Sequence, residues 1–191
     1  MFKIVAFTGK RGHGKTTAAQ ALELGQKYAH LNFADPLRQI AKIAYGLTDF
    51  ELNDPVAKET CLTRWPSRTP REIMQQIGTD MFRAYIPDTW TSNWVMRAVR
   101  AQSKAGLGEL EVFSGVTCSD LRFLNEEEKI RSVGGIIIRV IDPRKETDDS
   151  ASQHASETEM DQIIADHVII NDGSIEELQA KVLAIVLGDQ Y

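Results

Sequence analysis

The sequence predicts an α/β fold: a five-stranded parallel sheet with helices on both faces. The first observation is a short β-branched, apolar run at residues 3–7, typical of a strand buried in a parallel sheet. The second is its direct passage into a glycine-rich loop and then a helical segment. The third is the continued alternation of strand-like runs with helical segments, without repeats or long linkers. We therefore expect one domain over residues 1–191.

The glycine-rich loop has the spacing of a phosphate-binding loop. Residues 9–16 read GKRGHGKT, which fits G-x-x-x-x-G-K-[ST] without a mismatch. Its glycines let successive N–H groups point into one concavity, and the following helix adds the positive end of its dipole. There Lys15 would reach the outer phosphates of ATP, and the Thr16 hydroxyl would hold Mg²⁺. The alternative is a turn that only joins strand to helix.

This motif predicts the P-loop NTPase fold and identifies a donor site only. GTPases, ATPases and small-molecule kinases all carry such a loop, so the rest of the chain must decide among them. A dinucleotide fold is disfavoured because the loop does not fit G-x-G-x-x-G.

A second strand is expected at residues 30–34, followed by a helix with Asp35 as N-cap and Pro36 at its first position. Arginines then gather within eight residues, at Arg64, Arg68 and Arg71. Two explanations stay open for this cluster: a solvated loop, or a second anion site beside the phosphate-handling fold.

The next segment predicts a long helix that begins near Pro70. Trp90 and Trp94 lie four residues apart on a further helix, where such aromatics serve the core more often than they bind ligands. Together, residues 49–103 form the natural acceptor-binding insertion. The apolar stripe expected on the first helix consists of Ile73, Met74, Ile77, Met81 and Tyr85.

A buried strand is predicted at residues 110–118, and Asp120 lies just beyond its carboxyl end. Phosphate-loop enzymes place a second Mg²⁺ contact at this position. The alternative role for Asp120 is to cap the helix expected from Asn125. A further strand follows, and then a polar segment, residues 142–161, that is either a plain loop or a lid closing over phosphates. The last strand ends before a capping box formed by Ser174 and Glu177.

Several of these motifs together resemble the bacteriophage deoxynucleoside monophosphate kinases, distant relatives of adenylate kinase. They are GKRGHGKTT, FADPLR, PREIMQQIGTD, SDLRFLNEEEKIRSVGGIIIRV, HASE and HVIINDGSIEEL, and they span most of the chain. The combination of QQIGTD, SDLRFLNE and INDGS is more discriminating than the loop. The resemblance implies that ATP phosphorylates a deoxynucleoside 5′-monophosphate to the diphosphate, a step in supplying precursors for DNA replication.

The resemblance also assigns roles to residues. It places the donor phosphates at residues 12–17 and the donor adenine at residues 171–173, and it lets Arg122 and Arg144 reach the transferred phosphoryl. Arg64 and Arg68, in the stretch RWPSR, have no firm counterpart in these motifs. The candidate site is then as follows: catalytic, Lys15, Asp120, Arg122 and Arg144; ATP-binding, Lys10, Gly12, His13, Gly14, Lys15, Thr16, Thr17, Asn171 and Gly173; acceptor-binding, Asp35, Arg38, Arg68, Arg71, Gln75, Gln76 and Trp90; Mg²⁺-binding, Thr16 and Asp120.

The charge and the cysteine spacing limit the kinds of binding partner that the sequence predicts. The formal charge of -5 disfavours nonspecific nucleic-acid binding, and the two cysteines lack a metal-binding spacing. No secretory signal or membrane-spanning stretch is expected, so the protein should be cytoplasmic, in the host cell if a phage encodes it. A homodimer is left open. Three alternative functions remain: a kinase for another phosphorylated acceptor such as dephospho-coenzyme A or phosphomevalonate, a nucleotide-binding switch, and a structural domain with a vestigial loop.

Overall fold

The computed structural model describes residues 2–104, 113–145 and 155–188. The start of the third predicted strand and the middle of the predicted lid lie outside these residues. The chain forms two compact units. Unit 1 comprises Met1–Asn32 and Trp94–Tyr191, and unit 2 comprises Phe33–Asn93. Unit 2 begins and ends earlier than the predicted insertion at residues 49–103, whose acceptor-binding role stays a prediction.

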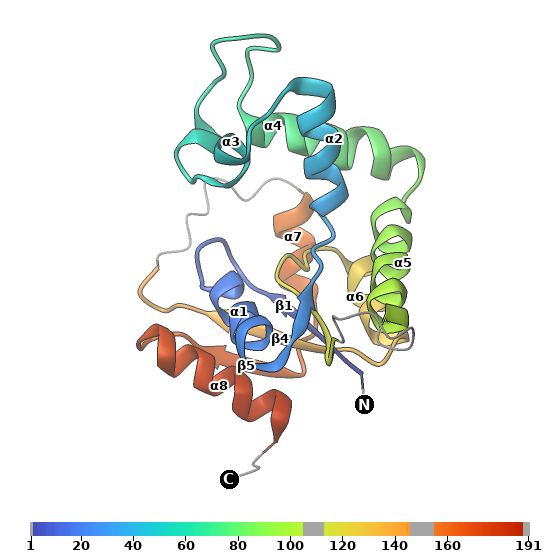
Figure 1. Ribbon diagram of the computed structural model, residues 1–191. Helices are drawn as coiled ribbons and strands as arrows, with labels where there is room; N and C mark the ends of the chain where they lie inside the picture. The colour runs from blue at the N-terminus through green and yellow to red at the C-terminus, as the bar shows by residue number, and fades with distance from the viewer. Residues whose placement is uncertain (1, 105–112, 146–154, 189–191) are drawn as a thin grey trace. The chain divides into compact units, whose positions relative to one another are not determined.

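Unit 1 contains the predicted parallel sheet of five strands (Figure 1). Their spatial order is β2-β3-β1-β4-β5, so β1, which leads into the glycine-rich loop, is central. The expected α/β architecture is confirmed. The strands are β1 (Lys3–Thr8), β2 (Tyr28–His30), β3 (Gly115–Cys118), β4 (Ile136–Ile141) and β5 (His167–Ile170).

Helices cover both faces of this sheet. On one face α1 and α8 share a core with β1 and β4 that includes Phe7, Leu22 and Val182, all fully buried. On the other face Arg139 of β4 donates to backbone oxygens at the end of α7. The helices of unit 1 are α1 (Lys15–Gln26), α6 (Leu124–Ser132), α7 (Ala155–Gln162), α8 (Ile175–Leu187) and the part of α5 (Thr89–Lys104) from Trp94 onward.

The second strand lies earlier than predicted. It occupies Tyr28–His30 instead of residues 30–34. The backbone N–H of Leu31 still donates to the Thr117 oxygen at 2.9 Å, but the side chain of Asn32 then accepts from the Ser119 N–H at 2.8 Å. The Asn32 side chain thus takes the place of a backbone acceptor in the ladder between β2 and β3, and the strand ends here.

Unit 2 is helical and has its own apolar core, built mainly from leucines, Ile73, Met74, Ile77 and Trp90. The second predicted helix is present, but its N-cap residue is Ala34 and Asp35 is its first residue, so the predicted N-cap is wrong by one position. The elements are α2 (Asp35–Tyr45), α3 (Asp49–Asn53), the 3₁₀ turn η1 (Ala57–Glu59), α4 (Pro70–Gln75) and the π-helical turn η2 (Gln76–Arg83), before the start of α5.

The helix predicted from Pro70 is divided, and its apolar stripe is correct only in its first half. Ile77 is buried, whereas Met81 is 48% exposed and Tyr85 is 85% exposed. The cause is η2, in which the Ala84 N–H reaches back five residues to the Thr79 oxygen. Such wide turns shift the angular position of every later side chain, so a stripe drawn at 3.6 residues per turn loses its phase.

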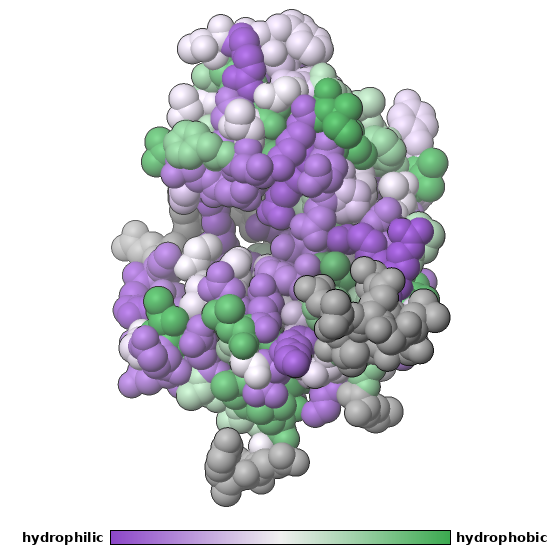
Figure 2. All heavy atoms as spheres, viewed as in Figure 1, coloured by the Kyte–Doolittle hydropathy of each residue, from purple (hydrophilic) through white to green (hydrophobic). Residues whose placement is uncertain are grey.

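Figure 2 shows one face of the molecule, on which hydrophilic residues predominate and hydrophobic ones are scattered among them. Among the described helices, none has both the length and the apolar character needed to cross a bilayer.

Candidate active site

The loop between β1 and α1 has a backbone path that only glycine adopts easily. Gly9 and Gly14 have φ angles of 132° and 97°, where a side chain would be strained. A Cβ on Gly9 would also lie 2.3 Å from the Val140 carbonyl oxygen. The loop closes on the Lys10 carbonyl oxygen, which accepts a hydrogen bond from Lys15 Nζ at 2.7 Å. Lys15, only 8% exposed, is therefore held against the loop.

The N-terminus of α1 has the charge distribution of an anion-binding site. The helix begins at Lys15, its N-cap Gly14 has no side chain to bond the first N–H groups, and its first turn contains no acidic residue. The positive end of the helix dipole is therefore uncompensated within α1. Thr16 is exposed in this first turn. This arrangement fits phosphate oxygens.

Asn171 and His13 join the loop to the ends of β4 and β5. The amide Nδ2 of Asn171, the residue after β5, donates to the His13 carbonyl oxygen at 3.0 Å. His13 is 6% exposed, and its Nδ1 accepts from the Asp142 N–H at 3.2 Å. Burial, and then the nearby Lys15 ammonium, lower the pKa of His13. The side chain is thus set up as a neutral acceptor that supports the loop from within.

Arg144, predicted to reach the transferred phosphoryl, is bound to Asp142. Its Nε and Nη2 donate to the two carboxylate oxygens at 2.9 and 3.0 Å, and hydrogen bonds from Arg144 lower the pKa of Asp142 to about 2. The same guanidinium donates to the carbonyl oxygens of Asn171 and Asp172 at 3.1 and 3.4 Å. Arg144 therefore supports the 171–173 loop, and it would have to leave Asp142 to reach a phosphoryl group.

Asp120 lies at the carboxyl end of the sheet. It follows β3, where Cys118 is paired with Ala6, two residues before β1 ends. The Cys118 thiol donates to Asp120 Oδ1 at 3.2 Å. Burial, and then the Asp120 charge, raise the pKa of this thiol, which therefore stays a protonated donor. The Cys118 thiol, at the end of β3, thus helps to orient the Asp120 carboxylate.

Asp120 is not the N-cap residue of the next helix, and a different carboxylate binds the backbone just before that helix. The N-cap residue of α6 is Phe123. Glu126, 2% exposed, accepts from the backbone N–H groups of Arg122 and Phe123 at 3.0 and 3.2 Å. Arg122 is partly buried beside this turn. The catalytic roles of Asp120 and Arg122 stay predictions.

The predicted acceptor residues in unit 2 have protein partners. Arg71 Nε donates to Glu59 at 2.5 Å, and Arg38 Nη1 lies 3.4 Å from Asp35. An acceptor phosphate would therefore compete with Glu59 for Arg71.

Four other predicted acceptor positions also lie in unit 2. Trp90 is 4% exposed and its indole N–H donates to the Gly78 oxygen at 2.9 Å, which favours its alternative role in the core. Arg68 reaches Gln76 at 3.4 Å, and Gln75 is partly buried on α4.

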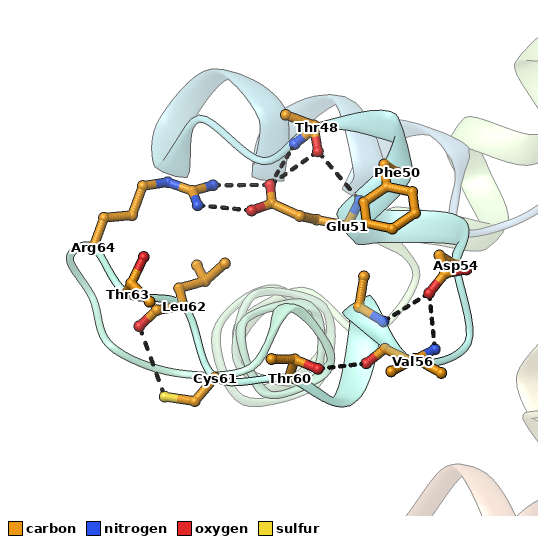
Figure 3. Close-up of a pocket in the computed structure, with 11 residues that line it drawn as sticks. Thr48, Phe50, Glu51, Asp54, Val56, Thr60, Cys61, Leu62, Thr63 and Arg64 are labelled. Carbon is orange, nitrogen blue, oxygen red and sulfur yellow. Dashed lines mark hydrogen bonds and ion pairs between the residues drawn. The ribbon is translucent and has the colours of Figure 1, made fainter.

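Arg64, the third arginine of the cluster, borders an open pocket of about 490 Å³ in unit 2 (Figure 3). Its two terminal nitrogens donate to the carboxylate oxygens of Glu51 at 2.7 and 2.8 Å. These bonds, and then the Thr48 N–H, lower the pKa of Glu51 to about 2. Since Arg64 and Arg71 each bind a different carboxylate, this unit does not present them as one bare cationic patch.

Sequence reasoning missed the residues that hold the predicted ones in place. Glu59, Asp142 and Glu126 are partners of predicted residues, and a further polar group around Asn32 is described below. Glu59 and Asp142 lie outside the motifs quoted above, whereas Glu126 lies inside SDLRFLNEEEKIRSVGGIIIRV but has no predicted role. One signal was available in the sequence: an acidic residue that directly follows an apolar strand. It marks Asp142, the residue after β4.

Comparison with known proteins identifies the family. Residues 58–182 match the family described as deoxynucleotide monophosphate kinase. The chain belongs to this family. A protein of Acanthamoeba polyphaga mimivirus, itself provisionally assigned as a deoxynucleotide monophosphate kinase, is 31% identical over 188 residues, which cover 96% of this chain and 95% of the relative.

Solved structures agree with the kinase fold. Shikimate kinase from Aquifex aeolicus has a TM-score of 0.50 at 13% identity, covering 97% of this chain and 96% of that one. Dephospho-CoA kinase from Campylobacter jejuni has a TM-score of 0.47 at 14% identity, covering 98% and 96%. The fold is that of the P-loop NTPases. The family match and the mimivirus relative make the chain a P-loop kinase, a phosphotransferase with a nucleotide-binding loop.

Proposed function

We propose that this kinase transfers the γ-phosphoryl group of ATP to the 5′-phosphate of a deoxynucleoside monophosphate. The match of residues 58–182 to the deoxynucleotide monophosphate kinases carries the proposal. The phosphate loop at residues 9–16 lies outside that match, so it supports a phosphoryl-donor site independently. The mimivirus relative is compatible with the predicted viral role in supplying DNA precursors.

On the donor side, the chain's own groups would bind and orient ATP. Backbone N–H groups of residues 12–17 and the α1 N-terminus would hold the phosphates, and Lys15 would shift from the Lys10 oxygen toward them. Mg²⁺ would neutralise charge on the phosphate oxygens. It takes oxygen ligands and keeps several waters, which the exposed Thr16 hydroxyl and the Asp120 carboxylate fit.

On the acceptor side, the proposal assigns a second phosphate to unit 2. Arg38, Arg68 and Arg71 are the cationic candidates, with Arg71 as the main anchor because a guanidinium binds phosphate bidentately. The Asp35 carboxylate, itself an anion, would bind another part of the acceptor. Transfer between two bound anions requires positioning and charge neutralisation more than a strong base. Arg122 would supply positive charge as the phosphoryl moves. A cytoplasmic location belongs to the proposal as a prediction, and the oligomeric state stays open.

The deciding experiment measures ATP consumption with a panel of nucleoside and deoxynucleoside monophosphates and a control without acceptor. Turnover that needs a deoxynucleoside monophosphate supports the proposal. Turnover with dephospho-coenzyme A or phosphomevalonate alone would assign a different acceptor, and turnover without any acceptor would indicate a nucleotide switch. Failure to bind ATP at all would indicate a vestigial loop.

A further inference from the structure

A second group of polar side chains lies at the carboxyl ends of β2 and β3 in unit 1. We call it the Asn32 cluster; it consists of Glu23 of α1, His30 at the end of β2, Asn32 and Ser119. None of the four was a candidate site residue. Ser119 is 5% exposed, and the His30 and Glu23 side chains are 19% and 28% exposed. Polar side chains that are buried to this extent normally have hydrogen-bond partners, so the contacts within this cluster need an explanation.

His30 lies between a carboxylate and a hydroxyl. Its Nδ1 is 2.8 Å from Glu23 Oε1, a buried carboxylate atom, but the geometry of this contact is not that of a hydrogen bond. Its Nε2 is 3.0 Å from Ser119 Oγ. Nε2 also lies 3.2 Å from Asn32 Oδ1, an amide oxygen that can only accept. Nε2 is therefore the donor on this side of the ring, and the Ser119 oxygen accepts from it.

Asn32 holds the same serine from the other side. Its Oδ1 accepts from the Ser119 N–H at 2.8 Å and lies 3.2 Å from Ser119 Oγ. An amide oxygen has two lone pairs, and the backbone N–H uses one of them. The Ser119 hydroxyl therefore accepts from His30 Nε2 and donates to Asn32 Oδ1, and both neighbours hold it in place.

A carboxylate, an imidazole and a serine hydroxyl in this order also occur in serine hydrolases. The surroundings here disfavour nucleophilic catalysis. Ser119 is almost fully buried, and its backbone N–H is bonded to Asn32 instead of facing a substrate oxyanion. The arrangement fits a positioning role better, because it holds both the backbone and the side chain of one residue.

The residues held in this way lie at two junctions of the chain. Ser119 directly precedes Asp120. Asn32 is the last residue of the first segment of unit 1, and Trp94 begins the second segment. Trp94 Nε1 donates to the Leu31 oxygen at 2.6 Å, and Arg97 donates to the Asn32 oxygen. The backbone at residues 31–32 is thus bonded from β3 and from α5.

We propose that the Asn32 cluster positions the Asp120 carboxylate for phosphoryl transfer, with Asn32 and His30 as positioning residues that act through Ser119. The inference rests on the proposed function in that Asp120 is taken to act on the reaction. A catalytic group displaced by about 1 Å can lose on the order of 10²-fold in rate. Because none of the four residues is assigned to the binding of either substrate, the loss of the cluster should lower kcat and leave both KM values within about twofold.

The test compares Asn32→Ala, Asn32→Asp and Ser119→Ala with Val182→Ala. Val182 of α8 is fully buried in the core that α8 shares with α1, and it is not part of the cluster, so its truncation lowers stability without removing a cluster contact. Four quantities are measured: kcat, the two KM values, the melting temperature, and the hydrogen-exchange rates of the Ser119 and Asp120 amides by NMR. Asn32→Asp keeps an acceptor oxygen for the Ser119 N–H and is used for the exchange measurement only, since its charge lies near Asp120.

We expect Asn32→Ala to lower kcat by about 10- to 100-fold, with faster exchange at Ser119 and Asp120, and Ser119→Ala to lower kcat by less. Asn32→Asp should restore slow exchange. Val182→Ala should lower the melting temperature but keep the wild-type kcat.

Wild-type kcat in folded Asn32→Ala and Ser119→Ala would overturn the proposal, as would unchanged exchange at Ser119. If the wild type phosphorylates no deoxynucleoside monophosphate, the proposed function fails, and the exchange rates still decide whether the cluster holds Asp120 in place. If Asn32→Ala does not fold, the same two criteria are applied to Ser119→Ala.

Discussion

Gly14→Ala should disturb the phosphate loop through a single identifiable contact. Gly14 has a φ angle of 97°. A Cβ there would lie 2.6 Å from Asn171 Nδ2 and 3.2 Å from Leu178 Cδ2. Since the Asn171 amide donates to the His13 oxygen at 3.0 Å, it cannot yield to the new methyl group without losing that bond.

The expected cost follows from these two effects. A side chain in the left-handed region costs about 1–2 kcal/mol, and loss of the Asn171 hydrogen bond costs about 1 kcal/mol. Gly14→Ala should therefore destabilise by about 2–3 kcal/mol, and Asn171→Ala alone by about 1 kcal/mol. In the double variant the bond is lost only once, so its cost should be about 1 kcal/mol less than the sum of the single variants.

Urea unfolding of the four proteins measures this coupling. Gly134→Ala is a matched control, because Gly134 also has a positive φ of 73° but a Cβ there would meet no atom within 4 Å. Gly134→Ala should show the backbone strain alone and be additive with Asn171→Ala. The reasoning is refuted if Gly14→Ala and Asn171→Ala are additive to within about 0.3 kcal/mol.

Three further predictions concern charged residues. Lys15→Ala should lower kcat by about 10²- to 10³-fold and, because it also removes the bond to the loop carbonyl, cost about 1–2 kcal/mol of stability; a folded variant with near wild-type turnover would exclude the donor role. Glu59→Gln should lower the acceptor KM about two- to fivefold by releasing Arg71, since an exposed pair is worth at most about 1 kcal/mol; an unchanged KM would remove Arg71 from the acceptor site. Glu51→Gln tests the ion pair with Arg64. The pKa of Glu51 is lowered to about 2 in the folded chain, so the pair's stability is fully present above the unfolded pKa near 4.5 and lost as the pH falls toward 2. The stability difference between wild type and Glu51→Gln, from urea unfolding at several pH values, should shrink across that window, and a constant difference would contradict the assignment.

The parts that could be predicted from sequence are those in which the interacting residues are neighbours along the chain. The loop at residues 9–16 has its glycines, its lysine and its helix start within one short segment. The capping box of Ser174 and Glu177 is equally local and was confirmed. The strand pattern worked because parallel strands are apolar on both faces and leave a continuous signal.

Prediction failed where a small local change alters distant geometry. The π-helical turn η2 turned Met81 and Tyr85 toward solvent, although their spacing fitted an α-helical stripe. The partners of arginines were equally invisible. Arg144 binds Asp142 two residues away and Arg71 binds Glu59 twelve residues away, and neither spacing belongs to a helix-face pair. A cation in a functional motif therefore does not reveal from sequence whether a carboxylate already holds it.

Two independent observations indicate the function, the family match and the phosphate loop. Hydrogen bonds between residues far apart in the sequence join the parts of unit 1 that they cover. The family match covers residues 58–182, whereas the phosphate loop lies at residues 9–16. The bond from Asn171 to His13 spans 158 positions and joins a matched residue to the loop. The bond from Ser119 to Asn32 spans 87 positions and joins the residue before Asp120 to the end of β2. If the loop and the matched region form one active site, breaking either contact should impair a reaction that requires both substrates. If only stability changes, the donor loop and Asp120 act independently of these contacts. The Gly14 variants therefore test the contact between Asn171 and His13, and the Asn32 variants test the contact between Ser119 and Asn32, within the same proposed site.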